Sequence, residues 1–239
     1  MNHRNPLTTY DCALIGWLLW FIWKGRNDYV FSKVRLDPSM VIEKAQQALI
    51  NYWTVWFPDN DRAVSNTPTP AVKWVPPAEH VLKVNVDGSF KASTAFAAIG
   101  LVCRDHWGHM QWAFVDKVKS ISAFMTKALA LKRALMILQD LGNKNVLLES
   151  DNQTLVHCVE NNQPSLCEWQ ARGIIDDITS VLKSESSFSV IYTPRQGNKA
   201  ADWLAAATNK EVCPIGWVGI PLPPLSQMLD NDMKATRSQ

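Results

Sequence analysis

Apolar residues recur along this chain with two different periodicities, and each periodicity predicts a different kind of secondary structure. Helical spacing dominates residues 10–57, where the apolar run CALIGWLLWFIW is followed by the amphipathic VIEKAQQALINYWTVW. Residues 83–90, KVNVDGSF, instead alternate valines with Lys83, Asn85 and Asp87. This alternation predicts a strand with one buried face, whose polar face ends in a carboxylate followed at once by a glycine.

The patterns after this strand predict an α/β fold. Short turns between the first three apolar segments predict antiparallel hairpins, and the order strand, strand, strand, helix, strand, helix, helix, strand, helix is typical of a mixed sheet with helices on its faces. We therefore expect a mixed five-stranded sheet flanked by helices. The expected strands are 83–90, 98–105, 110–118, 145–151 and 187–193, and the expected helices are 122–142, 152–161, 168–182 and 198–209.

Shifts in composition divide the chain into four parts. Residues 1–57 form a helical N-terminal segment, and residues 58–79 are rich in Pro, Asn, Asp, Ser and Thr, which predicts a linker. The α/β domain is expected at 80–208, and 209–239 is expected to be a C-terminal tail.

The amino-acid composition excludes few classes of function. A chain of 239 residues with 47% hydrophobic residues can bury a core, and its net charge of +2 neither requires nor excludes a nucleic-acid partner. Five cysteines without a C-x-x-C pair suit free thiols in a reducing compartment, so we expect an intracellular protein, nuclear or cytoplasmic. We also expect a monomer.

The apolar run near the N-terminus is too short to cross a bilayer by itself. Twelve residues at 1.5 Å each cover about 18 Å of a hydrocarbon core about 30 Å thick. We therefore do not expect a membrane protein. An alternative stays open, in which Trp17, Trp20 and Trp23 form a surface that binds a protein or associates with a membrane.

Three aspartates stand at the ends of expected elements. Asp87 and Asp151 end strands, and Asp202 lies in the first turns of a helix, where the dipole favours an anion. Each taken alone is explained by a turn or a helix cap. Three together, from separate elements, indicate a shared acidic site.

Five sequence blocks in this order and spacing resemble the ribonuclease H type 1 domain, in the plant reverse transcriptase-like branch derived from non-LTR retroelements. They are DGS, IGLVCRD, ALALKRAL, ESDN and PRQGNKAADWLA, and together they cover residues 80–208. The segment WFIWKGRNDYVF near the N-terminus also resembles the segment that precedes this domain in those elements.

The resemblance implies a metal-dependent endonuclease that hydrolyses the RNA strand of RNA–DNA hybrids. Family members hold two Mg²⁺ ions among four carboxylates, which must converge from different elements. It identifies Asp87, Asp151 and Asp202 as catalytic residues and as metal ligands, for Mg²⁺ or Mn²⁺, with no small-molecule cofactor. Gly88 is then expected to let a nucleic-acid backbone come close.

The chain departs from the family at the second carboxylate. The family's Met-x-Glu-Ala-x-Ala-Leu pattern reads MTKALAL here, so Lys127 stands where the family has a glutamate. A protonated lysine cannot coordinate a metal, although its flexible stem allows it to turn away. We expect metal binding to be weakened. Tyr192 likewise stands where the family commonly has a histidine, and it is a poor proton shuttle at neutral pH.

Four polar residues near the expected site suit contacts with phosphates or 2′-hydroxyls: Ser89, Asn152, Arg195 and Asn198. Asn198 is equally explained as the N-cap of the last helix. Two functions remain open. The first is an impaired ribonuclease H. The second is a chain without catalysis, which is either a binder of hybrid or structured nucleic acid or a retroelement remnant.

Overall fold

The computed structural model describes residues 9–33, 37–56, 73–93, 96–161, 167–213, 215–219 and 221–236. It divides the chain into two compact units, Met1–Thr69 and Pro70–Gln239. Residues 58–72, which are most of the expected linker, lie outside the described residues.

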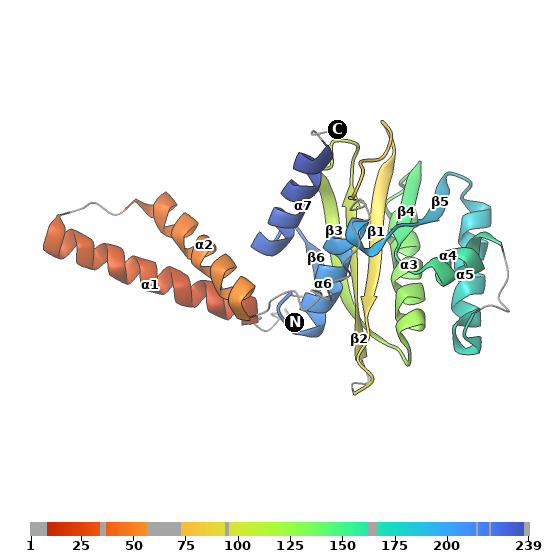
Figure 1. Ribbon diagram of the computed structural model, residues 1–239, viewed down its shortest axis with the longest axis horizontal. Coiled ribbons are helices and arrows are strands. Elements are labelled where there is room, and N and C mark those ends of the chain that lie inside the picture. The colour runs from red at the N-terminus through yellow and green to blue at the C-terminus, as the bar shows by residue number, and fades with distance from the viewer. Residues whose placement is uncertain are drawn as a thin grey trace, which may run out of the picture. The chain divides into compact units, whose positions relative to one another are not determined.

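The first unit is a pair of helices, α1 (Thr9–Ser32) and α2 (Pro38–Trp56), which contact each other (Figure 1). Val41, Ala45 and Leu49 follow one another every four residues on α2 and are buried. The prediction of helices within residues 10–57 is confirmed for the part of this segment that the structure describes. No described helix combines the length and the apolar character that a membrane span requires.

The second unit contains one mixed sheet of six strands in the order β5-β4-β1-β2-β3-β6. Strands β1, β2, β3 and β6 are antiparallel neighbours, whereas β4 lies parallel to β1 and β5 parallel to β4. The strands are β1 (Leu82–Ser89), β2 (Phe96–Arg104), β3 (Met110–Lys119), β4 (Val146–Ser150), β5 (Phe188–Tyr192) and β6 (Gly216–Val218).

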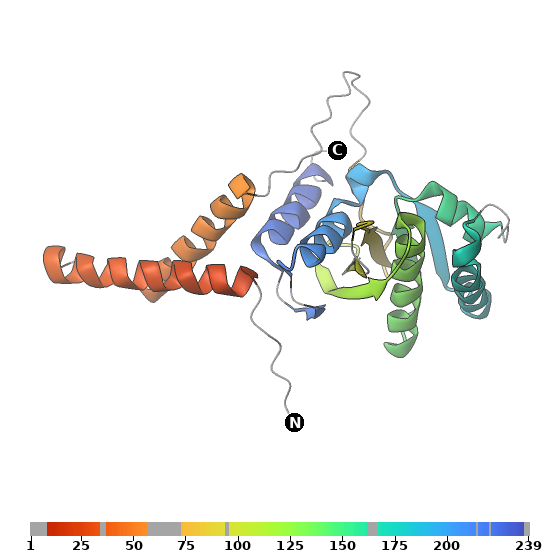
Figure 2. The same ribbon diagram turned by 90° about the horizontal axis from the view of Figure 1, so that it is seen from below.

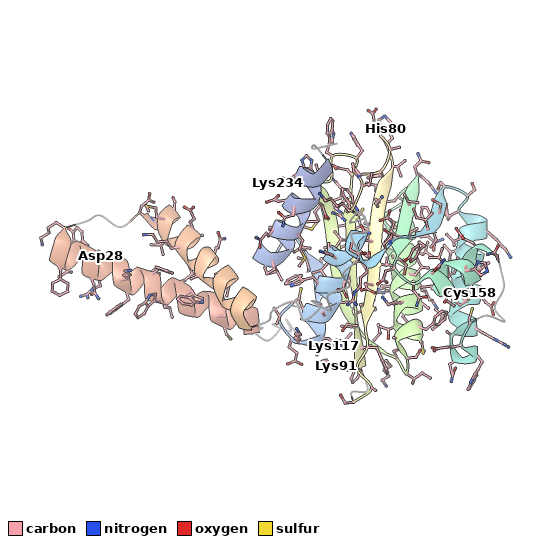
Figure 3. The ribbon with its side chains drawn as sticks, in the orientation of Figure 1. Asp28, His80, Lys91, Lys117, Cys158 and Lys234 are labelled. Carbon is pink, nitrogen blue, oxygen red and sulfur yellow. The ribbon has the colours of Figure 1, made fainter. Side chains whose placement is uncertain are left out.

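Helices cover both faces of this sheet. Helices α3, α4 and α5 lie on one side of it, and α6 and α7 lie on the other (Figures 1 and 2). Side chains fill the space between the helices and the sheet (Figure 3). The helices are α3 (Ala123–Asp140), α4 (Gln153–Glu160), α5 (Arg172–Ser184), α6 (Lys199–Asn209) and α7 (Pro223–Thr236).

Two glycines in the sheet let these helices come close. A Cβ added at Gly100 would lie 2.6 Å from the Ala201 carbonyl oxygen of α6, and one at Gly88 would lie 2.6 Å from Thr126 Cγ2 of α3. Such distances are shorter than van der Waals contact. Gly88 therefore allows a helix to approach, whereas the sequence pointed to the approach of a nucleic-acid backbone.

The predicted α/β fold class is confirmed, with three differences. The sheet has a sixth strand, because β6 pairs with β3 from within the expected tail. That same region forms a helix, α7, since its apolar residues Leu225 and Leu229 are buried. The polar face of β1 is also buried. Its residues Lys83, Asn85 and Asp87 are each at most 5% exposed.

Candidate acidic site

The parallel pairing of β1 and β4 brings two of the predicted acids together. Val86 on β1 is the register partner of Ser150 on β4, and each is followed directly by an aspartate. Neighbouring parallel strands present their carboxyl ends at the same edge of a sheet. Asp87 and Asp151 therefore lie side by side, with Asp87 only 1% exposed.

Helix α3 supplies the third member of this site. Its N-terminus is fixed by Ser122, whose hydroxyl accepts a hydrogen bond from the Met125 amide at 3.0 Å. Thr126 donates a hydrogen bond to the Ser122 carbonyl oxygen at 2.7 Å and is fully buried. The first turns of α3 are thus held in place, and Lys127 follows directly.

The Lys127 ammonium lies between the two aspartates. Its Nζ donates a hydrogen bond to Oδ1 of Asp87 and another to Oδ1 of Asp151, the latter at 2.5 Å. The Lys127 side chain is 17% exposed, so it does not turn away into solvent. Each bond joins opposite charges in a largely buried place, which makes both stronger than bonds between neutral groups.

Asp202 lies in the first turn of α6, as predicted, and its partner is a second cation. Arg195, in the short 3₁₀ helix Arg195–Gly197, approaches Asp202 Oδ2 to 3.5 Å. Both side chains are partly exposed, so this ion pair contributes little stability. The negative charge of Asp202 also raises the pKa of Asp87, although less than burial does.

Burial and neighbouring charges both shift the pKa values of the side chains in this site. Burial raises the pKa of Asp87 to about 7, the Lys127 ammonium opposes that rise, and Asp151 and Asp202 add to it. For Lys127, burial favours the neutral amine, but the two carboxylates outweigh burial and raise its pKa. Lys127 therefore stays charged at neutral pH.

The residues of this site do not fit a divalent metal ion. Across the described part of the chain, no three His, Cys, Asp or Glu side chains are grouped so that they can hold a metal. The oxygens of Asp87 and Asp151 that face each other are both used by an ammonium. A metal held by these oxygens would have to displace a bonded cation of the same sign. The prediction that Asp87, Asp151 and Asp202 bind metal stays a prediction.

The four residues predicted to contact nucleic acid have structural partners. Ser89 accepts hydrogen bonds from Asn209 at its carbonyl oxygen and at its hydroxyl, at 3.0 and 3.1 Å. Asn152 is the N-cap of α4, because its Oδ1 accepts from the Leu155 amide at 2.9 Å. Arg195 is paired with Asp202, as described above.

Asn198 occupies the N-cap position of α6, as one of the two predictions had it, and its side chain bonds to the sheet. It is fully buried, and its Nδ2 donates to the Val86 carbonyl oxygen at 3.0 Å while its Oδ1 accepts from Asn85 at 3.1 Å. It stands at the N-cap position of α6 but makes no side-chain cap bond. It braces β1 beside Asp87, and its contact with nucleic acid stays a prediction.

Sequence reasoning missed a buried polar network beneath the site. Asn85 Oδ1 accepts hydrogen bonds at 3.0 Å from both Trp74 and Arg104. The Arg104 guanidinium also stacks on the Trp74 ring, 3.5 Å from its centroid. Lys83 and Glu149 form a second buried pair at 2.6 Å. The signal was the row of polar residues on β1, for which the sequence predicted no burial.

The family comparison identifies the domain. The family model described as "Reverse transcriptase-like" matches residues 85–208. No curated protein matches the chain.

Several solved structures are similar to part of the chain. RNase H1 from the halophilic archaeon Halobacterium salinarum is 22% identical, with a TM-score of 0.48, over 54% of this chain and 98% of its own. LC11-RNase H1, isolated from compost by a metagenomic approach, is 21% identical, with a TM-score of 0.49, over 56% of this chain and 96% of its own. The foamy viral protease-reverse transcriptase, in complex with dsDNA, is 17% identical, with a TM-score of 0.45, over 58% of this chain and 96% of that one. Since the matched family region, 85–208, spans just over half of the 239 residues and contains β1 to α6, the protein belongs to the reverse transcriptase-like family.

Proposed function

We propose that this protein is a ribonuclease H-like, nucleic-acid-binding protein that binds RNA–DNA hybrids and cleaves them weakly or not at all. The family and the pairing of Asp87 with Asp151 support the first half of the proposal. One observation supports the second half: the Lys127 ammonium is hydrogen-bonded to both of these carboxylates.

The interaction energies in this site favour the Lys127 ammonium over a divalent metal ion. A dication 4 Å from an ammonium is repelled by about 8 kcal/mol even at an effective dielectric constant of 20. Binding of Mg²⁺ with millimolar affinity provides only about 4 kcal/mol. Mg²⁺ therefore cannot bind between Asp87 and Asp151 while Lys127 stays charged and in place.

Cleavage of a labelled RNA–DNA hybrid, measured with Mg²⁺ and with Mn²⁺, tests this proposal. The natural chain should give little or no product. Lys127→Glu supplies a carboxylate in place of the cation and should raise the cleavage rate by about tenfold or more, equivalent to about 1.4 kcal/mol in the barrier. Lys127→Gln is the matched control, because it removes the cation without adding a metal ligand.

Two outcomes would contradict the proposal. Equal metal-dependent cleavage by the natural chain and by Lys127→Glu would mean that the lysine does not impair catalysis. Failure of the natural chain to bind a hybrid at any salt concentration would favour the alternative, a retroelement remnant without this activity.

The origin of the chain is a second part of the proposal. We propose descent from a plant non-LTR retroelement, because residues 20–31, WFIWKGRNDYVF, resemble the segment that precedes the domain in such elements. The same origin suits an intracellular protein that meets nucleic acid in the nucleus or cytoplasm.

A further inference from the structure

We infer that Lys127 replaces the metal ion of this site with a built-in cation, so that the site excludes divalent metals and nucleic acid binds without them. The nucleic-acid half of this inference rests on the proposed function. The metal half depends only on the described residues.

The lysine is fixed by its helix as well as by its two carboxylates. A Cβ at Gly88 would lie 3.1 Å from the Lys127 amide nitrogen, so β1 and the backbone of α3 pass one another closely at this residue. The preceding turn is held by the Ser122 cap and by buried Thr126. Because the backbone is held on one side and Nζ on the other, the side chain spans a fixed gap between α3 and the two aspartates.

The charges of the site are nearly balanced without a metal. Above about pH 7, where Asp87 is ionised, the three carboxylates of Asp87, Asp151 and Asp202 lie with two cations, Lys127 and Arg195, which leaves one formal negative charge. A site with a fourth carboxylate in place of Lys127 would repel a phosphate until a metal neutralised it. Here the ammonium is always present, so chelation of divalent ions should not change the affinity for nucleic acid.

Binding of Mn²⁺ to the full-length protein, measured by electron paramagnetic resonance in the absence of nucleic acid, tests the metal half. The natural chain should bind no Mn²⁺ at this site. Lys127→Gln frees the two carboxylates and should bind Mn²⁺ with millimolar or tighter affinity. Lys132→Gln is the matched control, because Lys132 lies on the same helix and pairs with exposed Asp177. It should behave like the natural chain, and circular dichroism checks that each variant is folded.

The metal half is overturned by either of two results. One is Mn²⁺ binding by the natural chain with the affinity of Lys127→Gln. The other is the absence of Mn²⁺ binding by a folded Lys127→Gln, because the lysine would then not be what closes the site.

Fluorescence anisotropy of a labelled RNA–DNA hybrid tests the nucleic-acid half. At constant ionic strength the natural chain should bind equally well in EDTA and in Mg²⁺. Loss of a positive charge within about 8 Å of a phosphate costs up to about tenfold in affinity, so Lys127→Gln should bind about tenfold more weakly in EDTA and recover in Mg²⁺.

These experiments distinguish a failure of this inference from a failure of the proposed function. A natural chain that binds the hybrid only with Mg²⁺ overturns the inference and leaves the proposed function standing. A chain that binds no hybrid under either condition overturns the proposed function and the nucleic-acid half together, and the Mn²⁺ measurement still decides the metal half.

Discussion

At the scale of single residues, the character of this site depends on one side chain. Lys127 stands where the sequence resemblance predicts a glutamate, and its ammonium bonds to two carboxylates that would otherwise repel each other. The geometry that permits this contact depends in turn on a residue without a side chain. Gly88 lets α3 pass close to β1, so the backbone of Lys127 lies within reach of Asp87.

Gly88→Ala should therefore destabilise the protein and loosen the site. The added methyl would lie 2.9 Å from the Thr126 carbonyl carbon, and backbone atoms cannot rotate away as a side chain can. Overpacking of this kind costs about 1–3 kcal/mol. The free energy of unfolding in urea measures the effect.

Gly173→Ala provides the comparison for this variant. Nothing lies within 4 Å of a Cβ at Gly173, and the residue is in helix α5, where alanine is favoured over glycine by up to about 1 kcal/mol. It should be neutral or slightly stabilising. Equal losses of stability in the two variants would mean that the close approach at Gly88 is not what sets the cost.

At the scale of elements, the C-terminal helix completes the domain beyond the region that matches the family. The family match ends at residue 208, yet α7 follows it and carries Asp232, whose carboxylate pairs with Arg104 at 2.7 Å. Arg104 is 1% exposed and lies at the end of β2. Burial lowers the pKa of its guanidinium, and Asp232 opposes that shift. A charge so deeply buried needs its partner.

Asp232→Ala should consequently cost about 2–4 kcal/mol, less than a fully buried pair because the Asp232 side chain is 18% exposed. Chemical denaturation monitored by tryptophan fluorescence gives the value, and Trp74 on the Arg104 guanidinium is a suitable reporter. Asp230→Ala, at an exposed position of the same helix, should change stability by less than about 0.5 kcal/mol. If both variants were equally stable, the Arg104 pair would not be what holds α7.

At the scale of the whole molecule, the chain contains two units with very different surfaces. The sheet and its helices enclose a continuous core, which includes Leu101, Leu131 and Leu148. Helix α1 instead leaves large apolar side chains in solvent, with Trp20 52% and Phe31 82% exposed. Apolar residues exposed in such number on one helix indicate a surface that binds another protein or a membrane, or a tendency to aggregate.

Removal of residues 1–69 should leave a folded domain that behaves better in solution than the full chain. Because the second unit has its own core, the melting temperature of its transition should stay within about 3 °C of the full-length value. Calorimetry measures this transition, and light scattering after size-exclusion chromatography measures association. Aggregation of the truncated protein, or loss of its cooperative transition, would mean that the N-terminal helices are part of the domain's stability.

Much of this fold was predictable because its signals are local. The alternation in KVNVDGSF, the cap at Ser122 and the acid in the first turn of α6 each depend on neighbours within a few residues. Gly142 was likewise a predictable helix end, since its φ of 64° suits the residue that follows a helix. What the sequence did not predict was the burial of the polar face of β1, because alternation does not reveal what covers a face.

The sequence by itself determined the order of the elements from β1 to α6, the positions of the three aspartates at element ends and the presence of a lysine where the resemblance predicts an acid. Only the tertiary structure decided where that lysine points and what covers β1. The reason is the separation of the partners along the chain: Lys127 meets Asp87 across 40 residues, and Arg104 meets Asp232 across 128. Backbone periodicity controls contacts over a few residues, whereas contacts at such separations exist only after the sheet and helices have packed together.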